Sequence, residues 1–469
     1  MNDLLVMKFG GTSMGSAERI RSAAALCEEA WRQRPLVVVV SAMAKVTDML
    51  LEALRHAEGG DEAGLNRLLA ELDAKHRQCS NELLEGEARD RTQRVLDGIL
   101  EDFTRIARGV LMLGERPPRS VDEAVAAGER LSAALMAAYL ESRGVDAFAV
   151  NGWDVIVTDA VFGNASPLME QTREKANALL RPAIEKRRLP VVTGFNGATL
   201  DGRPTTLGRG GSDFSASILA AVLDAAELWI WSDVDGIMSA DPRLVPDAKV
   251  LEEITYREAA ELAYNGAKVL HPRTLAPLME KGIPVWSRNS FNPSFPGTRI
   301  VPETKDGPIG PRAVTSMLNV ALVSVDPASA VLSGTRIMAR SLEALAAANA
   351  EVLALTSSSY RQNFCFLIRQ SELPAVIERL EETFSLELAH GYLHPIDVDL
   401  DVGLIAIVGE GMRGHPGLAG RIFTAISREM VNIIAIAQGS SELTIAIVVR
   451  RDGVEKAVRA VHSECALGR

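Results

Sequence analysis

The chain has few cysteines and no long apolar run. Its four cysteines, Cys27, Cys79, Cys365 and Cys465, are widely separated among 469 residues, without a Cys-x-x-Cys pair or a histidine at zinc-site spacing. This pattern excludes a disulfide framework and a structural zinc site, and it predicts reduced thiols. No stretch approaches the roughly 18 apolar residues that a membrane-spanning helix needs, and the N-terminus lacks a signal-peptide pattern. We therefore expect a cytoplasmic protein that has no membrane partner.

The chain also has fewer basic than acidic residues. The 50 Lys and Arg residues are outnumbered by 61 Asp and Glu residues, so the formal net charge is -11. This excess of negative charge opposes attraction to nucleic acid, which we do not expect as a partner. The 47% of apolar residues is ordinary for a folded protein, and 469 residues exceed what one hydrophobic core supports. Two or three domains are therefore expected.

The first 300 residues alternate short apolar runs with longer Ala, Leu, Glu and Arg stretches. The runs lie at residues 4–7, 36–40, 190–193 and 228–231. Because they are apolar at successive positions, they predict strands buried on both faces, as in a mostly parallel sheet sandwiched by helices. A ligand is then expected at the carboxyl ends of the strands. Residues 53–108 are rich in Glu, Arg, Leu and Ala and contain few β-branched residues, so they predict a helical excursion from the sheet.

Prolines and glycines between residues 292 and 311 mark the expected end of this α/β domain, which we place at residues 1–300. The order strand, helix, strand, strand then occurs twice, beginning near residues 320 and 404. The repeat predicts two small α+β modules, at residues 301–395 and 396–469.

Two glycine-rich loops each lie between an expected strand and an expected helix. The first, residues 8–13, reads KFGGTS, and the second, residues 208–213, reads GRGGSD. Such loops can bring amide groups to a phosphate at a helix N-terminus, but either alone also fits a plain tight turn. Asp213 also fits an N-cap, whereas Arg209 looks buried. Taken together, the loops indicate a polyphosphate held from two sides, with Lys8 and Arg209 offsetting its charge.

Three further segments hold candidate ligand-binding residues. Ser41 follows the second strand and leads into a loop of small residues, where Thr47 or Asp48 fits a helix cap equally well. Glu129 lies among small and apolar residues, so it needs either an ordinary salt bridge or a ligand ammonium group. The acidic residues at 233, 235 and 241 have the spacing of a calcium loop, but Ile237 occupies a ligand position and the distal Glu is missing. Calcium is therefore excluded, and we expect no metal site built by the protein alone.

Four motifs in this order resemble the aspartate kinases of the amino acid kinase superfamily. They are KFGGTS at residues 8–13, GERLS at 128–132, GRGGSD at 208–213 and GAKVLHP at 266–272. The resemblance covers essentially the whole chain, and the two C-terminal modules resemble the ACT domains with which these enzymes sense amino acids. Residues 44–45 and 431–442 look most like the kinase portion of bifunctional aspartokinase-homoserine dehydrogenases. Because the sequence ends at Arg469, we expect no dehydrogenase.

The resemblance implies a reaction and its ligands. An aspartate kinase transfers the γ-phosphate of ATP, bound with Mg²⁺, to the β-carboxylate of L-aspartate and forms 4-phospho-L-aspartate. This is the first step toward lysine, threonine and methionine. The alternatives are a kinase for glutamate or N-acetylglutamate and an ACT-type amino acid sensor without catalysis.

The resemblance also assigns the site residues. Catalysis falls to Lys8 and Asp213. The expected aspartate-binding residues are Thr47, Glu129, Phe195, Arg209 and Ser212. The expected ATP-binding residues are Lys8, Gly10, Gly11, Ser41, Ser232, Asp233, Met238, Arg243 and Lys268. Met238 and Ser232 stand where the family often has Tyr and Thr, so a thioether replaces a ring in the expected nucleotide site.

Regulation by an amino acid effector is expected to be weakened or redirected. Gln438 matches the effector-loop glutamine of threonine-regulated relatives, but Leu355 stands at the corresponding position of the first module. A leucine cannot supply the paired amide hydrogen bonds that a bound amino acid needs. The modules are expected to pair across subunits and so to form a homodimer or a higher homo-oligomer.

Overall fold

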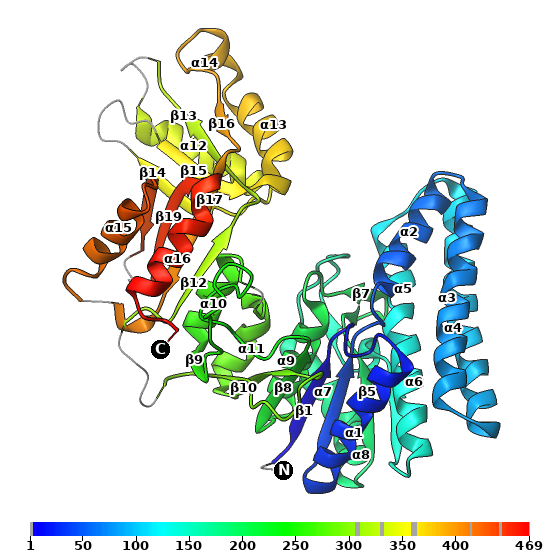
Figure 1. The fold of residues 1–469 in the computed structure, drawn as a ribbon. Helices are drawn as coiled ribbons and strands as arrows, with labels where there is room; N and C mark the ends of the chain where they lie inside the picture. The colour runs from blue at the N-terminus through cyan, green and yellow to red at the C-terminus, as the bar shows by residue number, and fades with distance from the viewer. Residues whose placement is uncertain are drawn as a thin grey trace. The chain divides into compact units, whose positions relative to one another are not determined.

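The computed structural model describes residues 3–267, 269–304, 310–328, 333–357, 364–412, 415–439 and 443–468. The chain forms two compact units (Figure 1). The N-terminal unit comprises Met1–Ile237, Glu252–Tyr256 and Leu270–Thr304, and the C-terminal unit comprises Met238–Leu251, Arg257–Val269 and Lys305–Arg469. Among the residues that the structure describes, none of the helices is both long and apolar enough to cross a membrane.

An eight-stranded sheet forms the centre of the N-terminal unit, with the strand order β3-β5-β2-β1-β8-β10-β11-β9. The strands are β1 (Leu5–Phe9), β2 (Leu36–Val40), β3 (Ala147–Val150), β5 (Leu189–Thr193), β8 (Glu227–Ser232), β9 (Glu253–Thr255), β10 (Val285–Asn289) and β11 (Thr298–Val301). All pairings are parallel except that of β10 with β11. The predicted, mostly parallel sheet is therefore confirmed, and the four expected strands are β1, β2, β5 and β8.

The central strands end level with one another. Phe9, the last residue of β1, is paired with Val40 on one side and with Trp231 on the other. Every residue of β1 and β2 is buried, because helices cover both faces of the sheet as the apolar runs predicted. The loops that leave these strands consequently begin at one edge of the sheet.

Helices α1 (Ala17–Gln33) and α6 (Ala127–Ser142) cover one face of the sheet, and α9 (Gly211–Val222) covers the other. Helices α7 (Met169–Leu179) and α11 (Pro272–Lys281) pack against α9. Because α9 is covered on all sides, its residues from Phe214 to Val222 are buried, as expected for a helix that is apolar all round.

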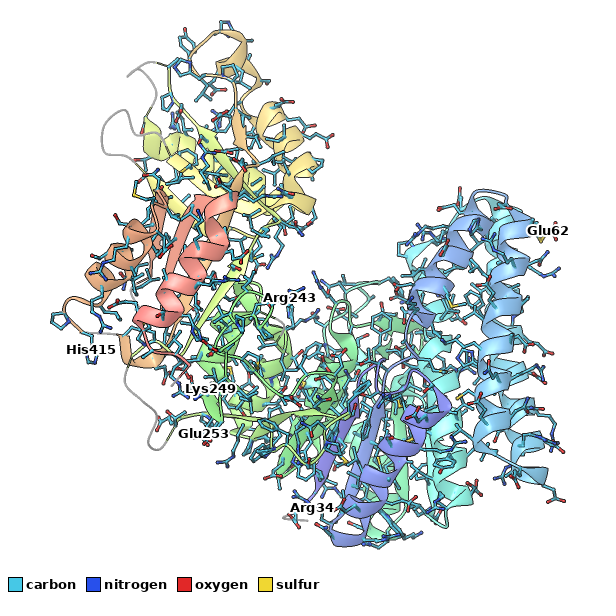
Figure 2. The ribbon with its side chains drawn as sticks, in the orientation of Figure 1. Arg34, Glu62, Arg243, Lys249, Glu253 and His415 are labelled. Carbon is cyan, nitrogen blue, oxygen red and sulfur yellow. The ribbon has the colours of Figure 1, made fainter. Side chains whose placement is uncertain are left out.

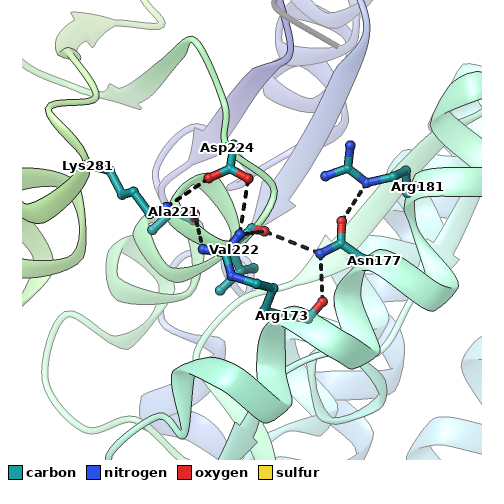
Figure 3. A network of polar contacts seen from close by, with 7 residues as sticks. All are labelled: Arg173, Asn177, Arg181, Ala221, Val222, Asp224 and Lys281. Atoms are coloured by element: carbon teal, nitrogen blue, oxygen red, sulfur yellow. Dashed lines mark hydrogen bonds and ion pairs between the residues drawn. The ribbon is translucent and has the colours of Figure 1, made fainter.

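The C-terminal end of α9 is fixed by side chains from α7 and α11 (Figure 3). Arg173 of α7 donates hydrogen bonds to the carbonyl oxygens of Ala221 (3.2 Å) and Val222 (3.0 Å). Asp224 accepts from Arg173 and from Lys281 of α11, at 3.1 Å each. Arg173 thus satisfies carbonyl groups in the last turn of the helix, and both cations complement the negative end of its dipole.

The predicted helical excursion is formed by α2 (Val46–Glu58), α3 (Glu62–Leu83) and α4 (Gly86–Leu113). Helices α3 and α4 form a long hairpin that packs against α2 and α6, and Glu62 marks one end of it (Figure 2). Ala126 separates α5 (Pro118–Val125) from α6.

The remaining elements of this unit are the three strands of a small sheet, β4 (Val157–Thr158), β6 (Asn196–Thr199) and β7 (Pro204–Thr206), the short helix α8 (Arg181–Glu185) and the 3-10 turn Gly152–Asp154. Strand β7 leads directly into the second glycine-rich loop.

The C-terminal unit contains two four-stranded antiparallel sheets. One sheet has the order β14-β15-β13-β16, and the other has the order β12-β17-β19-β18. The strands are β12 (Ala313–Met317), β13 (Val320–Val325), β14 (Ala354–Ser357), β15 (Phe364–Arg369), β16 (Asp397–Asp399), β17 (Val402–Val408), β18 (Ile433–Gln438) and β19 (Thr444–Arg450). The predicted repeat of strand, helix, strand, strand is confirmed, and Val320, Leu367, Leu404 and Val448 belong to an apolar core shared by the two sheets.

The helices of this unit are α12 (Gly334–Ala347), α13 (Leu373–Thr383), α14 (Ser385–Ala389), α15 (Leu418–Arg428) and α16 (Val454–Glu464), with the part of α10 (Tyr256–Tyr264) that follows Tyr256. The 3-10 turns are Gln370–Glu372, Glu410–Met412 and Arg451–Gly453.

The two sheets exchange strands across the expected module boundary. Strand β12 lies in the part of the chain assigned to the first module, but it pairs with β17 of the second sheet. Strand β16 lies beyond residue 395, but it pairs with β13 of the first sheet. Residues 238–251 and 257–269 likewise belong to the C-terminal unit rather than to the α/β domain. A division of the chain at residues 300 and 395 therefore does not separate the sheets, because strand pairing joins segments that are distant in sequence.

Candidate active site

A pocket of about 700 Å³ lies at the carboxyl ends of the central strands of the N-terminal unit. Its walls come from the loops after β1, β2 and β5, from the start of α2, from α6 and from the loop between β7 and α9. The lining residues are Lys8, Gly11, Ser41, Ala42, Met43, Ala44, Lys45, Thr47, Asp48, Leu51, Glu129, Phe195, Gly208, Arg209, Gly210, Gly211, Ser212 and Asp213. Nine of the residues proposed from the sequence are thus brought together.

Lys8 and Asp213 form an ion pair in this pocket. Lys8 lies within β1, paired with Val39 and Ile230, so it extends from the sheet just before the glycine loop. Its Nζ atom is 2.5 Å from Oδ1 of Asp213, which lies in the first turn of α9. Lys8 is buried, with 7% of its surface exposed. Asp213 is not the N-cap of α9, because Gly210 occupies that position.

The two glycines of the first loop have different surroundings. The amide of Gly10 donates a 3.0 Å hydrogen bond to the carbonyl oxygen of Trp231 in β8. This amide is already used by the sheet, which corrects the expectation that both glycine amides face a phosphate. Gly11 lines the pocket, and a Cβ atom at this position would lie 3.1 Å from the carbonyl oxygen of Ala42. A side chain at this position would therefore push the loops that follow β1 and β2 slightly apart.

Glu129 is a buried carboxyl group with one oxygen available. It is 3% exposed, and its Oε1 atom accepts a 3.1 Å hydrogen bond from the amide of Ala42. Its Oε2 atom is buried and has no hydrogen-bond partner among the described residues. Glu129 forms no salt bridge with the described residues, and the neighbouring Arg130 pairs instead with Asp102 at 3.3 Å. Burial raises the pKa of Glu129 to about 8, although the Ala42 amide and the nearby charge of Lys8 favour the ionised form.

The second glycine loop presents Arg209 to the pocket. Gly208 and Gly210 on either side of it have φ angles of 75° and 70°, in the left-handed region that glycine adopts without strain. Arg209 is exposed rather than buried as expected, and its guanidinium forms no hydrogen bond or ion pair with the described residues. An unpaired guanidinium in a pocket is suited to a carboxylate or a phosphate.

Asp122 holds the end of β7, the strand that leads into the second glycine loop. The sequence did not indicate this role. Asp122 is 2% exposed, and it accepts hydrogen bonds at 2.8 Å from the amides of Gly163 and Thr206 and from the Thr206 hydroxyl. Burial raises the pKa of this carboxyl group, while these hydrogen bonds lower it. Asp122 lies outside the four sequence motifs, and only the structure shows its partners.

A second support comes from Arg273 of α11, which the sequence also left unassigned. It donates to the side chain of Asn164 at 2.5 Å and to the carbonyl oxygens of Ala165 at 2.6 Å and Leu207 at 3.2 Å. Residue 207 immediately precedes the glycine loop, so Arg273 holds the loop at its base.

Ser41, Thr47, Phe195 and Ser212 complete the predicted part of the pocket lining. The Phe195 amide donates a 2.9 Å hydrogen bond to the Ser215 hydroxyl, which ties the loop after β5 to α9. Phe195 has a φ of 72°, which is unusual for a side chain of this size.

The structure does not gather the other predicted ATP-binding residues in this pocket. Ser232 and Asp233 lie at the end of β8 and do not line it. Met238 and Arg243 belong to the C-terminal unit, where Arg243 pairs with Asp241 at 2.5 Å (Figure 2). Lys268 lies outside the described residues.

The predicted regulatory positions lie on strands of the C-terminal unit. Gln438 is exposed at the end of β18, and Leu355 is 36% exposed on β14. Within the described part of the chain, no group of three or more His, Cys, Asp or Glu side chains could hold a metal ion.

The fold and the pocket define a class of protein. An ion-paired lysine lies at the edge of a parallel sheet, beside glycine loops, with a guanidinium and a buried carboxylate oxygen that have no partner among the described residues. This arrangement suits a small ligand with charged groups of both signs, next to a phosphate group.

Comparisons with known proteins give the family. The model of the amino acid kinase family matches residues 3–289, and a model of the ACT domain matches residues 405–465. The chain is 36% identical to bifunctional aspartokinase/homoserine dehydrogenase 1, chloroplastic, of Arabidopsis thaliana, over 99% of this chain and 51% of that protein. It is 32% identical to aspartokinase 3, chloroplastic, of Arabidopsis thaliana, over 98% of this chain and 81% of that protein. The chain belongs to the aspartokinases of the amino acid kinase family.

Solved structures agree with this assignment. The structure of E. coli aspartokinase III in complex with aspartate and ADP, in the R-state, matches with a TM-score of 0.84 and 29% identity, over 98% of this chain and 99% of that one. Its complex with lysine and aspartate, in the T-state, matches with a TM-score of 0.80 and 30% identity, over the same shares of the two chains. The chain spans about half the length of the bifunctional relatives that it matches.

Proposed function

We propose that the chain is an ATP-dependent aspartate kinase that phosphorylates the β-carboxylate of L-aspartate to 4-phospho-L-aspartate. The proposal rests on two side chains of opposite charge that line one pocket. Glu129 offers a buried oxygen and Arg209 a guanidinium, and neither group has a partner in the described part of the chain. A carboxylate and a guanidinium in one pocket select a zwitterion, as an α-amino acid is.

The acceptor is held by these two side chains. Glu129 binds the α-ammonium group and Arg209 binds the α-carboxylate, while Thr47, Phe195 and Ser212 form the remaining wall. The Ala42 amide on Oε1 fixes the Glu129 carboxyl group, so that Oε2 faces the ligand without a loss of side-chain freedom on binding.

The reaction is an in-line displacement at phosphorus. A β-carboxylate oxygen forms the new bond to the γ-phosphorus while the bond from phosphorus to the bridging oxygen of ADP breaks, and that oxygen keeps the electron pair. A carboxyl group with an ordinary pKa near ~3.9 is already ionised at neutral pH, so no general base is required. Catalysis then rests on positioning and on stabilisation of charge.

Lys8 and Gly11 supply that stabilisation. The ammonium group of Lys8 and the Gly11 amide face the transferring phosphoryl group, and Asp213 orients Lys8 through the 2.5 Å ion pair. Ser41 and residues 232–233, with Met238, Arg243 and Lys268, remain the proposed contacts of the nucleotide.

Mg²⁺ fits this site only as a partner of the nucleotide. The described residues contain no cluster of three metal ligands, but Asp213 places one carboxylate in the pocket. Mg²⁺ in kinases is commonly held by one or two carboxylates together with substrate phosphates. When bound, the ion neutralises charge on the phosphate oxygens.

Two other functions are less well supported. N-acetylglutamate has no ammonium group to pair with Glu129, and glutamate is longer by one methylene group. A sensor without catalysis would have no physical reason to keep Lys8 and Asp213 at ion-pair distance in a pocket with Arg209.

Regulation through the ACT-like sheets belongs to the same proposal. Gln438 is available to an amino acid effector on β18, whereas Leu355 cannot supply an amide. The edge strands of these sheets suit pairing between subunits in a homodimer or a higher homo-oligomer. The free cysteines suit a cytoplasmic protein.

An ATP-dependent hydroxamate assay with aspartate, glutamate and N-acetylglutamate tests the acceptor. We expect product with aspartate at a kcat/KM at least about tenfold above that with glutamate, because one methylene in a fitted pocket is worth ~1–3 kcal/mol. Product with N-acetylglutamate alone would refute the role of Glu129. If no acceptor gives product, the kinase function is excluded and the amino acid sensor without catalysis remains as the alternative.

Substitutions of Lys8 and Arg209 distinguish catalysis from binding of the acceptor. Lys8→Ala is expected to lower kcat by about 10²–10³-fold with an unchanged fold, because it removes transition-state stabilisation. Arg209→Ala is expected to raise chiefly the KM for aspartate, with Arg209→Lys as the matched variant that keeps the charge. Full activity of Lys8→Ala would exclude the mechanism.

A further inference from the structure

Lys45 lines the pocket without a partner. It is exposed, and its ammonium group forms no hydrogen bond or ion pair with the residues that the structure describes. Three basic residues line the pocket, and of the other two Lys8 is paired with Asp213, whereas Arg209 is unpaired. Lys45 is therefore a cation of the pocket lining that has no ion pair with the described residues.

Lys45 has an unusual backbone conformation, which it shares with one other residue of the pocket lining. Seven residues other than glycine have a positive φ in the described part of the chain. Five of them follow the last residue of a helix by two positions, which is a common ending of helices. They are Arg187, Asp224, Asn349, Met430 and Ala466. The remaining two, Lys45 with φ 68° and Phe195 with φ 72°, both line the pocket.

Folding alone gives no reason for lysine at this position. Lys45 is the N-cap of α2, yet its backbone is left-handed and its side chain makes no capping hydrogen bond. N-caps are usually extended Ser, Thr, Asp or Asn residues, and glycine tolerates a left-handed backbone without strain. A cation is also unfavourable at the positive end of the helix dipole. Backbone strain that persists in this way is typical of functional sites.

The neighbours of Lys45 place it beside the first glycine loop. A Cβ atom on Gly11 would lie 3.7 Å from the Cα atom of Ala44, the residue before Lys45, and a Cβ atom on Gly15 would lie 3.5 Å from the Ala44 Cβ atom. The loop of Arg209 instead packs against Phe195, because a Cβ atom on Gly211 would lie 2.7 Å from its ring. Lys45 and Arg209 thus belong to different walls of the pocket.

We propose that Lys45 contacts the terminal phosphate of the nucleotide and shares with Lys8 the negative charge of the phosphoryl group during transfer. The proposal rests on the proposed kinase function. Asp213 offsets part of the charge of Lys8, so a second cation on the side of the glycine loop supplies charge that Lys8 alone does not. Arg209, on the other wall, remains with the α-carboxylate of the acceptor.

Three variants of Lys45 test this assignment by steady-state kinetics with aspartate and MgATP. Lys45→Ala removes the charge and keeps the backbone strain, Lys45→Gly removes both, and Lys45→Arg keeps the charge. We expect Lys45→Ala and Lys45→Gly to lower kcat by about 10–100-fold and to raise the KM for ATP, with less than about a threefold change in the KM for aspartate. Lys45→Arg should stay within a few-fold of the unchanged protein.

The glycine variant separates charge from backbone geometry. Because it relieves the left-handed strain, Lys45→Gly should be at least as stable to heat as the unchanged protein, so a loss of activity would not come from unfolding. Met430→Gly, at a helix end with φ 58° and 92% exposure, is the matched control that relieves similar strain away from the pocket and should leave kcat unchanged. Normal kcat in Lys45→Gly would overturn the proposal.

Failure of this proposal can be distinguished from failure of the proposed function. If the unchanged protein phosphorylates aspartate and Lys45→Gly is equally active, only the role of Lys45 is lost. If the unchanged protein phosphorylates none of the three acceptors, the kinase function fails, and calorimetry of ATP binding then decides the role of Lys45. A Kd for ATP at least about fivefold weaker in Lys45→Gly would support the contact, and an equal Kd would exclude it.

Discussion

The buried carboxyl group of Glu129 is expected to make aspartate binding depend on pH. Its pKa in the free protein is about 8, so it is mostly protonated at neutral pH, whereas an ammonium group binds only the ionised form. Aspartate binding must therefore release a proton from Glu129. One pKa unit corresponds to ~1.4 kcal/mol, so binding is weakened about tenfold at pH 7 and about a hundredfold at pH 6 relative to the fully ionised site.

Calorimetry in buffers of different ionisation enthalpy measures this proton directly. We expect release of nearly one proton for each aspartate bound at pH 6 to 7, falling as the pH approaches 8, together with an affinity that rises about tenfold per pH unit. Glu129→Gln should bind more weakly at pH 8, release no proton and lose the pH dependence. Asp48→Asn, which removes an exposed carboxylate from the same pocket, should keep it. Affinity that is constant from pH 6 to pH 8 in the unchanged protein would refute this reasoning.

The protonation of Glu129 also makes the stability of the folded protein depend on pH. This stability falls as the pH rises, whereas the affinity for aspartate increases. Because the pKa of Glu129 is raised in the folded protein from its ordinary 4.5, the folded state holds the proton more tightly than the unfolded chain does. The contribution of this group to stability is therefore fully present below pH 4.5 and is lost as the pH rises to about 8. Saturating aspartate is expected to restore part of it at pH 8 in thermal unfolding.

Three further predictions concern the residues that hold the pocket in place. Asp122→Ala should lower the free energy of unfolding by roughly 3 kcal/mol, because it leaves buried donors without an acceptor, and a change below about 0.5 kcal/mol in denaturant unfolding would contradict this. Gly128→Ala should raise the KM for aspartate, since its Cβ atom would lie 2.8 Å from that of Ala42 and displace the amide that holds Glu129. Gly98→Ala, with open space around it in α4, should instead stabilise the protein by about 0.5–1 kcal/mol without a change in KM. Arg173→Ala should lower the midpoint of thermal unfolding by freeing the end of α9, with normal KM values as the control.

Local sequence patterns predicted the parts of the fold that depend on apolar periodicity. The runs that became β1, β2, β5 and β8 are buried on both faces, and such runs have few alternatives in a soluble domain. The two glycine loops were also predictable, because glycines between an expected strand and an expected helix permit the tight turns that such a connection needs.

Features set by distant parts of the chain were not predictable in this way. The Gly10 amide is used by the carbonyl oxygen of Trp231, and Asp122 finds its partners at Gly163 and Thr206. The exposure of Arg209, which was expected to be buried, likewise depends on how its loop packs against other segments. Periodicity shows which side chains are covered but not which segment covers them.

The exchange of β12 and β16 has a consequence for how this protein can be divided. A chain cut after residue 395 would leave β13 without β16, and a fragment that begins at residue 396 would lack β12 and so expose an edge of β17. Neither fragment would carry its complete sheet. The two sheets can therefore be inherited, lost or transferred to another protein only together, and a gene fusion that preserves their fold has to join the chain outside residues 313–464, because α16 packs into the core of the second sheet.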